Sequence, residues 1–144
     1  MNTVHRFTRQ TLKRIAAVAA AGYASFAFSG EVKVLLAGNQ EVPQVTTAAS
    51  GSGSFTVGDD GSISGSVSTL SIEGTAAHIH EGAPSANGPV IVPLTKTSAT
   101  VWSVPAGAKL TEAQMKSYKA GQLYVNVHSV ANKGGEIRGQ LEPK

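Results

Sequence analysis

The sequence predicts an all-β fold, a sandwich or barrel of short antiparallel strands. Stretches in which apolar and polar residues alternate recur along the chain, and turn residues separate them roughly every eight to twelve residues, the spacing typical of all-β domains. Gly, Ser and Thr are abundant and only 6% of the residues are aromatic, a composition that suits strands and turns better than a helical bundle. A chain of 144 residues supports one such domain.

The first 29 residues are predicted to be a secretory signal peptide. Residues 1–14 carry four basic residues and no acid, and residues 15–28 are apolar and rich in small side chains. This apolar run is shorter than the about 20 residues that a comfortable transmembrane helix needs. We therefore expect a mature domain over residues 30–144 that is periplasmic or secreted and has no membrane span.

The positive charge of the chain belongs to this leader. The sequence has 12 Lys and Arg against 9 Asp and Glu, a formal net charge of +3. Four of the basic residues lie in the leader, which leaves eight basic against nine acidic residues in the predicted mature domain. A nucleic-acid-binding protein would need a clustered basic face, so no nucleic-acid partner is expected.

The first half of the domain predicts a strand over residues 31–37 and a hairpin formed by residues 52–57 and 62–70. Asp60-Gly61 between two alternating segments is a strong hairpin signal. In the second arm apolar residues and serines take opposite faces, as in a half-buried strand. We interpret Asp59 and Asp60 as a solvated turn rather than a calcium site.

The second half adds two strands and one helix. Residues 89–94 are a short apolar strand bounded by prolines, which places it near a sheet edge, and residues 98–104 form another strand. The one helix is predicted over residues 111–120, where Thr111 is the N-cap and Gln114 completes a capping box. This helix is expected to connect strands.

Two histidines of the chain lie on one predicted strand, separated by a single residue. Side chains alternate along a strand, so His78 and His80 share a face with backbones about 6.6 Å apart, while Ile79 points into the core. Two imidazoles at this spacing can converge on one metal ion.

A third histidine ends the alternating strand over residues 123–129. Leu123, Val125 and Val127 take one face of this strand, and His128 takes the other together with Tyr124 and Asn126. If the two histidine strands are neighbours, their histidines project from the same outer surface of the sheet. The remaining histidine of the chain lies in the predicted leader.

The available ligands, three imidazoles and no cysteine thiolate, limit the metal ions that this surface could bind. Thiolate ligation is excluded, and an all-imidazole set suits copper(II), zinc or nickel, of which copper binds tightest. Three protein ligands leave an open position for water or substrate. Glu81 and Asn126 are candidates for holding the ring nitrogens in the right tautomer. The alternative is that the histidines are ordinary surface polar residues.

Other chemistry has little support in the sequence. No G-x-S-x-G nucleophile motif and no glycine-rich phosphate loop before a helix are present. In the closing strand, residues 136–141, we expect Glu136, Arg138 and Gln140 to face outward, with Glu136 and Arg138 as an exposed charge pair. No catalytic residue is assigned.

The chain resembles the CHRD domain, first named from chordin. The motifs that carry the likeness are LLAGNQEVP (residues 35–43), GTAAHIHEGAPSANGPVIVPL (residues 74–94), YVNVHS (residues 124–129) and GGEIRGQL (residues 134–141). The resemblance implies a Greek-key β-sandwich, immunoglobulin-like or superoxide-dismutase-like, in a secreted or periplasmic protein over residues 30–144.

A more distant resemblance concerns the histidines. The stretch HIHE, residues 78–81, is similar to the H-V-H-E copper strand of copper/zinc superoxide dismutases, and His128 matches the late copper histidine of that family. The bridging histidine, the zinc ligands and the disulfide cysteines have no counterpart. Arg138 could stand in for the anion-guiding arginine, although its position in the motif does not match. The resemblance implies a three-histidine copper site and leaves dismutase activity open.

These observations favour an exported protein that holds one copper ion through His78, His80 and His128, in periplasmic copper handling or redox. Zinc is the less favoured metal. One alternative is a copper-only superoxide dismutase-like enzyme, against which the few scattered cations of the domain argue. The other is a non-catalytic module that binds protein or glycan. A protein partner or a homodimer is left open.

Overall fold

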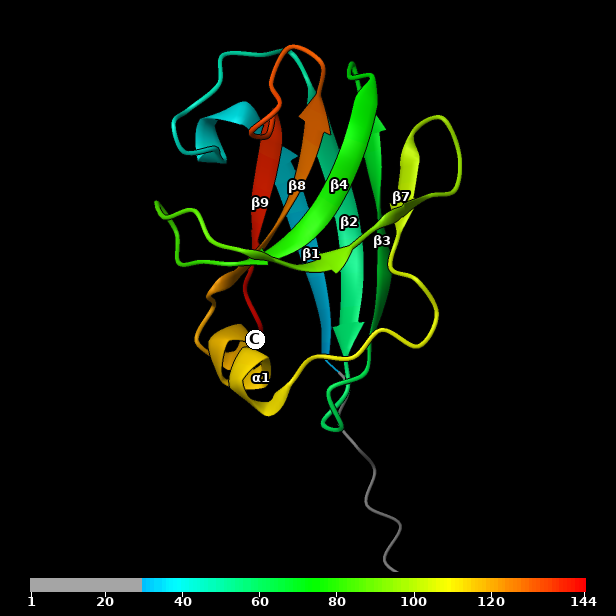
Figure 1. Ribbon diagram of the computed structural model, residues 1–144, viewed down its shortest axis with the longest axis vertical. Coiled ribbons are helices and arrows are strands. Elements are labelled where there is room, and N and C mark those ends of the chain that lie inside the picture. The colour runs from blue at the N-terminus through cyan, green and yellow to red at the C-terminus, as the bar shows by residue number, and fades with distance from the viewer. Residues whose placement is uncertain (1–29) are drawn as a thin grey trace, which may run out of the picture.

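The computed structural model describes residues 30–144. Within these residues, nine strands form one antiparallel sheet, accompanied by one α-helix, α1, and a 3-10 turn, η1 (Figure 1). The predicted signal peptide, residues 1–29, lies outside the described residues. The elements are β1 (Gly30–Ala37), η1 (Gly38–Gln40), β2 (Ser50–Val57), β3 (Ile63–Leu70), β4 (Gly74–Glu81), β5 (Val90–Pro93), β6 (Thr95–Lys96), β7 (Val101–Ser103), α1 (Glu112–Lys119), β8 (Leu123–Ser129) and β9 (Ile137–Leu141).

The sheet curls into a nearly closed barrel. The strand order is β5-β4-β8-β9-β1-β2-β3-β7-β6, and β9 joins β1 through the pair Ala37 and Arg138. β5 pairs with β4 at one end of this order and β6 pairs with β7 at the other, although only Leu94 separates β5 from β6. The Leu94 amide also donates to the Ala77 carbonyl (2.9 Å). The predicted all-β sandwich or barrel is therefore confirmed. The two strands at the edges of the sheet, β5 and β6, follow each other directly in the chain.

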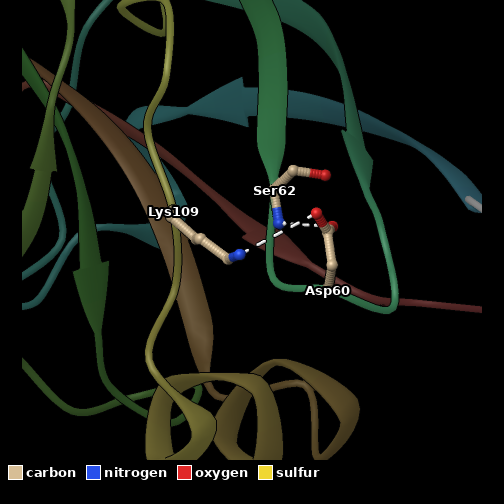
Figure 2. A network of polar contacts seen from close by, with 3 residues as sticks. All are labelled: Asp60, Ser62 and Lys109. Atoms are coloured by element: carbon tan, nitrogen blue, oxygen red, sulfur yellow. Dashed lines mark hydrogen bonds and ion pairs between the residues drawn. The ribbon is translucent and has the colours of Figure 1, made fainter.

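The β2–β3 hairpin forms where the Asp-Gly turn predicts it. The Asp60 side chain accepts a hydrogen bond from the Ser62 amide (3.0 Å), and Lys109 Nζ lies 3.9 Å from the other carboxylate oxygen (Figure 2). Hydrogen bonds from Ser62 are the main cause of the lowered pKa of Asp60. Gly61 has φ +83°, a conformation that favours glycine. The Asp60 carboxylate therefore holds a solvent-exposed turn together.

The barrel interior is filled by the side chains of every second residue along each strand. Burying an aliphatic or aromatic side chain of this kind contributes about 1.5–3 kcal/mol, so this set decides the register of the sheet. Because side chains alternate, the residues between them must face outward, including the histidines of β4. The main buried apolar residues are Val32, Val34, Leu36, Phe55, Val67, Ile79, Trp102, Val125, Val127, Ile137 and Leu141.

Helix α1 lies at one end of the barrel, and η1 and the segment after it lie at the other (Figure 1). The predicted capping box is present: Thr111 Oγ1 accepts from the Gln114 amide (3.2 Å), and Gln114 Oε1 accepts from the Thr111 amide (2.8 Å). Tyr118 is the buried residue of the helix. Within residues 30–144, no helix has the length and apolar character needed to cross a bilayer.

The predicted strand over residues 98–104 is shorter in the structure. β7 begins only at Val101, because the Ser98 hydroxyl accepts hydrogen bonds from the amides of Thr100 (3.3 Å) and Val101 (3.1 Å). Such bonds offer the backbone an alternative to the sheet ladder. The two-residue strand β6 was not predicted.

The outer face of β8 is covered, although its alternation predicts a wet face. Tyr124 and Asn126 point away from the core and are each only 2% exposed. The cover is formed by the segment after η1 and by the loop over residues 82–88, which the Asn87 side chain ties together by donating to the Val42 carbonyl (2.6 Å). A second, polar layer is therefore enclosed on this side of the barrel.

Candidate metal centre

The two histidine strands are antiparallel neighbours. In their register Ala76 faces His128 and His78 faces Asn126, so His128 is diagonal to His78 on the same face of the sheet. The ring centroid of His78 is 4.8 Å from that of His128 and 5.6 Å from that of His80. One ring nitrogen from each histidine lies within 4.8 Å of the other two. The structure thus brings together the three histidines singled out from the sequence.

Backbone carbonyls fix the tautomers of two of these rings. His80 Nδ1 lies 2.8 Å from the Gly88 carbonyl oxygen, and His128 Nδ1 lies 2.8 Å from that of Lys133. A carbonyl oxygen only accepts, so each Nδ1 carries the proton and each neutral ring keeps a free lone pair on Nε2. The Nε2 of His80 is buried and has no hydrogen-bond partner. A buried acceptor without a partner is what a metal ion would satisfy.

His78 completes the set through its other nitrogen. Its Nδ1 lies 3.0 Å from His128 Nε2 and donates to it, because the latter can only accept while its own Nδ1 holds the proton. A metal ion would take the lone pairs of His80 Nε2 and His128 Nε2, and that of His78 Nδ1 once its proton has moved to Nε2. The donor set therefore fits a metal that prefers imidazole.

The electrostatics favour the neutral form of the His78 and His80 rings, the form that binds metal. Burial lowers the pKa of His78, and the neighbouring His128 and His80 lower it further. Burial also lowers the pKa of His80, against the hydrogen bond to Gly88, which raises it. The desolvated rings thus resist protonation.

The two candidates for supporting residues are placed differently. Asn126 lies beside the cluster, and its side-chain amide opposes the lowering of the His80 pKa. Glu81 lies away from it and accepts a hydrogen bond from the Ser117 hydroxyl of α1 (2.5 Å). The expectation for Glu81 is wrong because it follows His80 directly, and alternation turns it to the opposite face.

Arg138 is not an exposed charge. It is 1% exposed, and its Cζ lies 3.4 Å from the ring centroid of Tyr124. Its Nη2 donates to the Ala83 carbonyl (3.0 Å) and to Gln140 Oε1 (3.2 Å), and burial lowers its pKa. The predicted exposed pair with Glu136 is therefore wrong, and the side chain lacks the water-facing position that guiding an anion requires. The loop over residues 82–88 covers it.

Glu41 is a buried acid at this site that the sequence reasoning missed. It is 4% exposed, and burial raises its pKa to about 7, against the charge of Arg138 and a hydrogen bond from Asn126. A Cβ at Gly135 would collide with its carboxyl group. The sequence offers only the signal of a charged residue after a predicted strand, and this residue type favours exposure.

Comparison with known proteins identifies the family of the chain. The CHRD domain matches residues 32–141, which include β2 to β9, all of β1 except its first two residues, and the three clustered histidines. No match is found among curated proteins or among solved structures. The chain thus belongs to the CHRD domain family.

Proposed function

We propose that this protein is exported and binds one copper ion through His78, His80 and His128, in copper handling or redox outside the cytoplasm. The observation that carries the proposal is the buried Nε2 of His80, which has no partner and lies in a cluster whose ligand nitrogens are within 4.8 Å of one another. The leader-like residues 1–29 support export.

The donor set favours copper over zinc. Three imidazole nitrogens suit either ion, and copper(II) binds such ligands more tightly than zinc(II) does. His78 Nδ1 and His128 Nε2 lie 3.0 Å apart as partners of a hydrogen bond in the metal-free cluster, so these two side chains already lie close enough to share one ion.

Copper would supply one-electron chemistry, and the chain would hold and orient it. His78 and His128 are only partly buried, so the cluster can be reached from solvent, while His80 anchors it from the covered side. Three ligands leave a position open for an exchanging ligand. A superoxide dismutase-like enzyme would also need a cation facing the anion's approach, a place that the buried Arg138 does not fill.

Calorimetric and absorption titrations with copper(II) and zinc(II) test the proposal. We expect one copper per chain, tighter than zinc, and loss of this binding in His80→Ala. Ser62→Ala, in the distant β2–β3 turn, is the control and should bind as the wild type does. One-to-one binding that survives His80→Ala unchanged would contradict the three-histidine site. No binding at all would favour a protein- or glycan-binding module instead.

A further inference from the structure

Tyr124 is the middle layer of a stack that ends on His80. Its ring is nearly parallel to the imidazole, with an interplanar angle of 4° and centroids 4.8 Å apart. The guanidinium of Arg138 packs on the Tyr124 ring at 3.4 Å. His80 comes from β4 and Arg138 from β9, the strands on either side of β8, so the two groups approach the ring from opposite sides.

The backbone of Gly88 joins the outer edges of the two rings. Its amide donates to the Tyr124 hydroxyl (3.2 Å), and its carbonyl accepts from His80 Nδ1 (2.8 Å). A Cβ at Gly88 would collide with the Glu81 carbonyl, so the residue can approach this closely only as glycine. His80, Gly88 and Tyr124 therefore form a closed ring of contacts.

We propose that Tyr124 is a positioning residue for the metal centre, which acts through Gly88 to keep His80 protonated on Nδ1 and free on Nε2. Neutral imidazole in water favours the opposite tautomer, with the proton on Nε2. The protein must therefore reverse the intrinsic preference before His80 can present Nε2 to a metal.

Each contact has a separate part in this reversal. The Gly88 carbonyl accepts the Nδ1 proton, and the Tyr124 hydroxyl holds the Gly88 residue so that its carbonyl faces the ring. The stack fixes the plane of the imidazole, and Arg138, held by the Ala83 carbonyl, backs the stack. Hydrogen-bond partners of metal ligands commonly set the tautomer in this way.

The inference rests on the proposed function for the identity of the ligand, but the tautomer is a property of the metal-free protein. Nitrogen-15 NMR of the imidazoles at pH 8 measures it directly. We expect His80 to be protonated on Nδ1 in the wild type. Tyr124→Phe keeps the stack and removes the acceptor of the Gly88 amide, so its population of the Nε2-protonated form should rise. Tyr118→Phe, at the other buried tyrosine on α1, should leave the spectrum unchanged.

A copper titration of the same variants completes the test. Tyr124→Phe should bind about tenfold more weakly than the wild type, as is typical when a supporting hydrogen bond of a ligand is lost. The metal-free variant should stay folded, with a modest fall in melting temperature because the Gly88 amide loses its acceptor. A wild-type His80 protonated on Nε2, or a Tyr124→Phe variant with the tautomer and affinity of the wild type, overturns the inference. Absence of copper binding in the wild type with the tautomer shift present overturns the proposed function alone.

Discussion

Two regions of the outer surface of this barrel differ in solvent exposure, although side chains alternate in the same way along the strands of both. On β1, β2 and β3 the outward residues meet solvent, and even apolar Leu35 is 74% exposed. On β8 and β9 the outward residues Tyr124, Asn126 and Arg138 are buried, and charged Arg138 is 1% exposed. Strand parity decides which side chains leave the core, whereas the loops decide whether they reach water. The second face can hold a desolvated polar site because it is covered.

The largest expected difference between the faces is in stability. Arg138→Ala removes the packing on Tyr124 and a cation near buried Glu41, so we expect the free energy of unfolding to fall by about 3 kcal/mol. Lys33→Ala, also a lost cation but on the open face, should change it by less than about 0.5 kcal/mol. Urea unfolding of both variants measures the difference. Equal losses would mean that the covered face is no more than a second surface.

The pH dependence of copper affinity tests the covered face next. The pKa values of His78 and His80 lie below the ordinary value of about 6.5, so protons compete with copper only below that pH. We expect a constant affinity above it and, at lower pH, a fall that reaches about tenfold per pH unit for each histidine that must lose a proton. Calorimetric titrations between pH 5 and 8 measure this. A flat affinity across that range would argue against imidazole ligands.

Glu41 should give the covered face a pH-dependent stability. The unfolded chain loses the Glu41 proton near pH 4.5, whereas the folded protein keeps it to about 7. The folded state thus binds more protons in this window, so the free energy of unfolding falls as pH rises through it. Glu41→Gln should remove this slope and be more stable than the wild type at pH 8, by about 1 kcal/mol after screening by solvent. Thermal unfolding from pH 4 to 8 tests it, with Glu31→Gln on the open face as the control that keeps the slope.

The smallest effect is expected on the open face. Leu35→Ser exchanges an exposed apolar side chain for one like its neighbours on β2, so stability should stay within about 0.5 kcal/mol of the wild type. Copper binding should be unchanged as well. A clear loss, measured by urea unfolding, would reveal that this face is covered by something, for instance by a second copy of the chain.

Local patterns predicted most of the fold and the centre of the site. The hairpin followed from Asp60-Gly61, the helix from its capping box at Thr111, and the shared face of the histidines from their spacing. Each of these features depends on residues that lie close together in the sequence, so the sequence alone is enough to predict it. Alternation along the strand also predicts the orientation of Glu81, which follows His80 directly and therefore points away from the three clustered histidines.

Contacts between distant segments explain what was missed. Arg138 is buried because a loop more than 50 residues earlier folds over it, as its bond to Ala83 shows. Glu41 is buried because the segment after η1 packs on β8, and Gly88 supports His80 only because its loop returns to β4. Residue type favours exposure for an acid or an arginine, and no local pattern records the loop that overrides it.

The nearly closed barrel also limits pairing between the sheet edges of this chain and strands of other chains. A sheet edge with unpaired amides and carbonyls is a template for aggregation. Here the two ends of the strand order are β5, with four residues and Pro93, and β6, with two residues. These edge strands are short, and one of them ends in a proline, which has no amide hydrogen. They therefore offer few free backbone groups with which a strand of another chain could pair. The topology of the sheet thus protects the domain against edge-to-edge pairing with other chains.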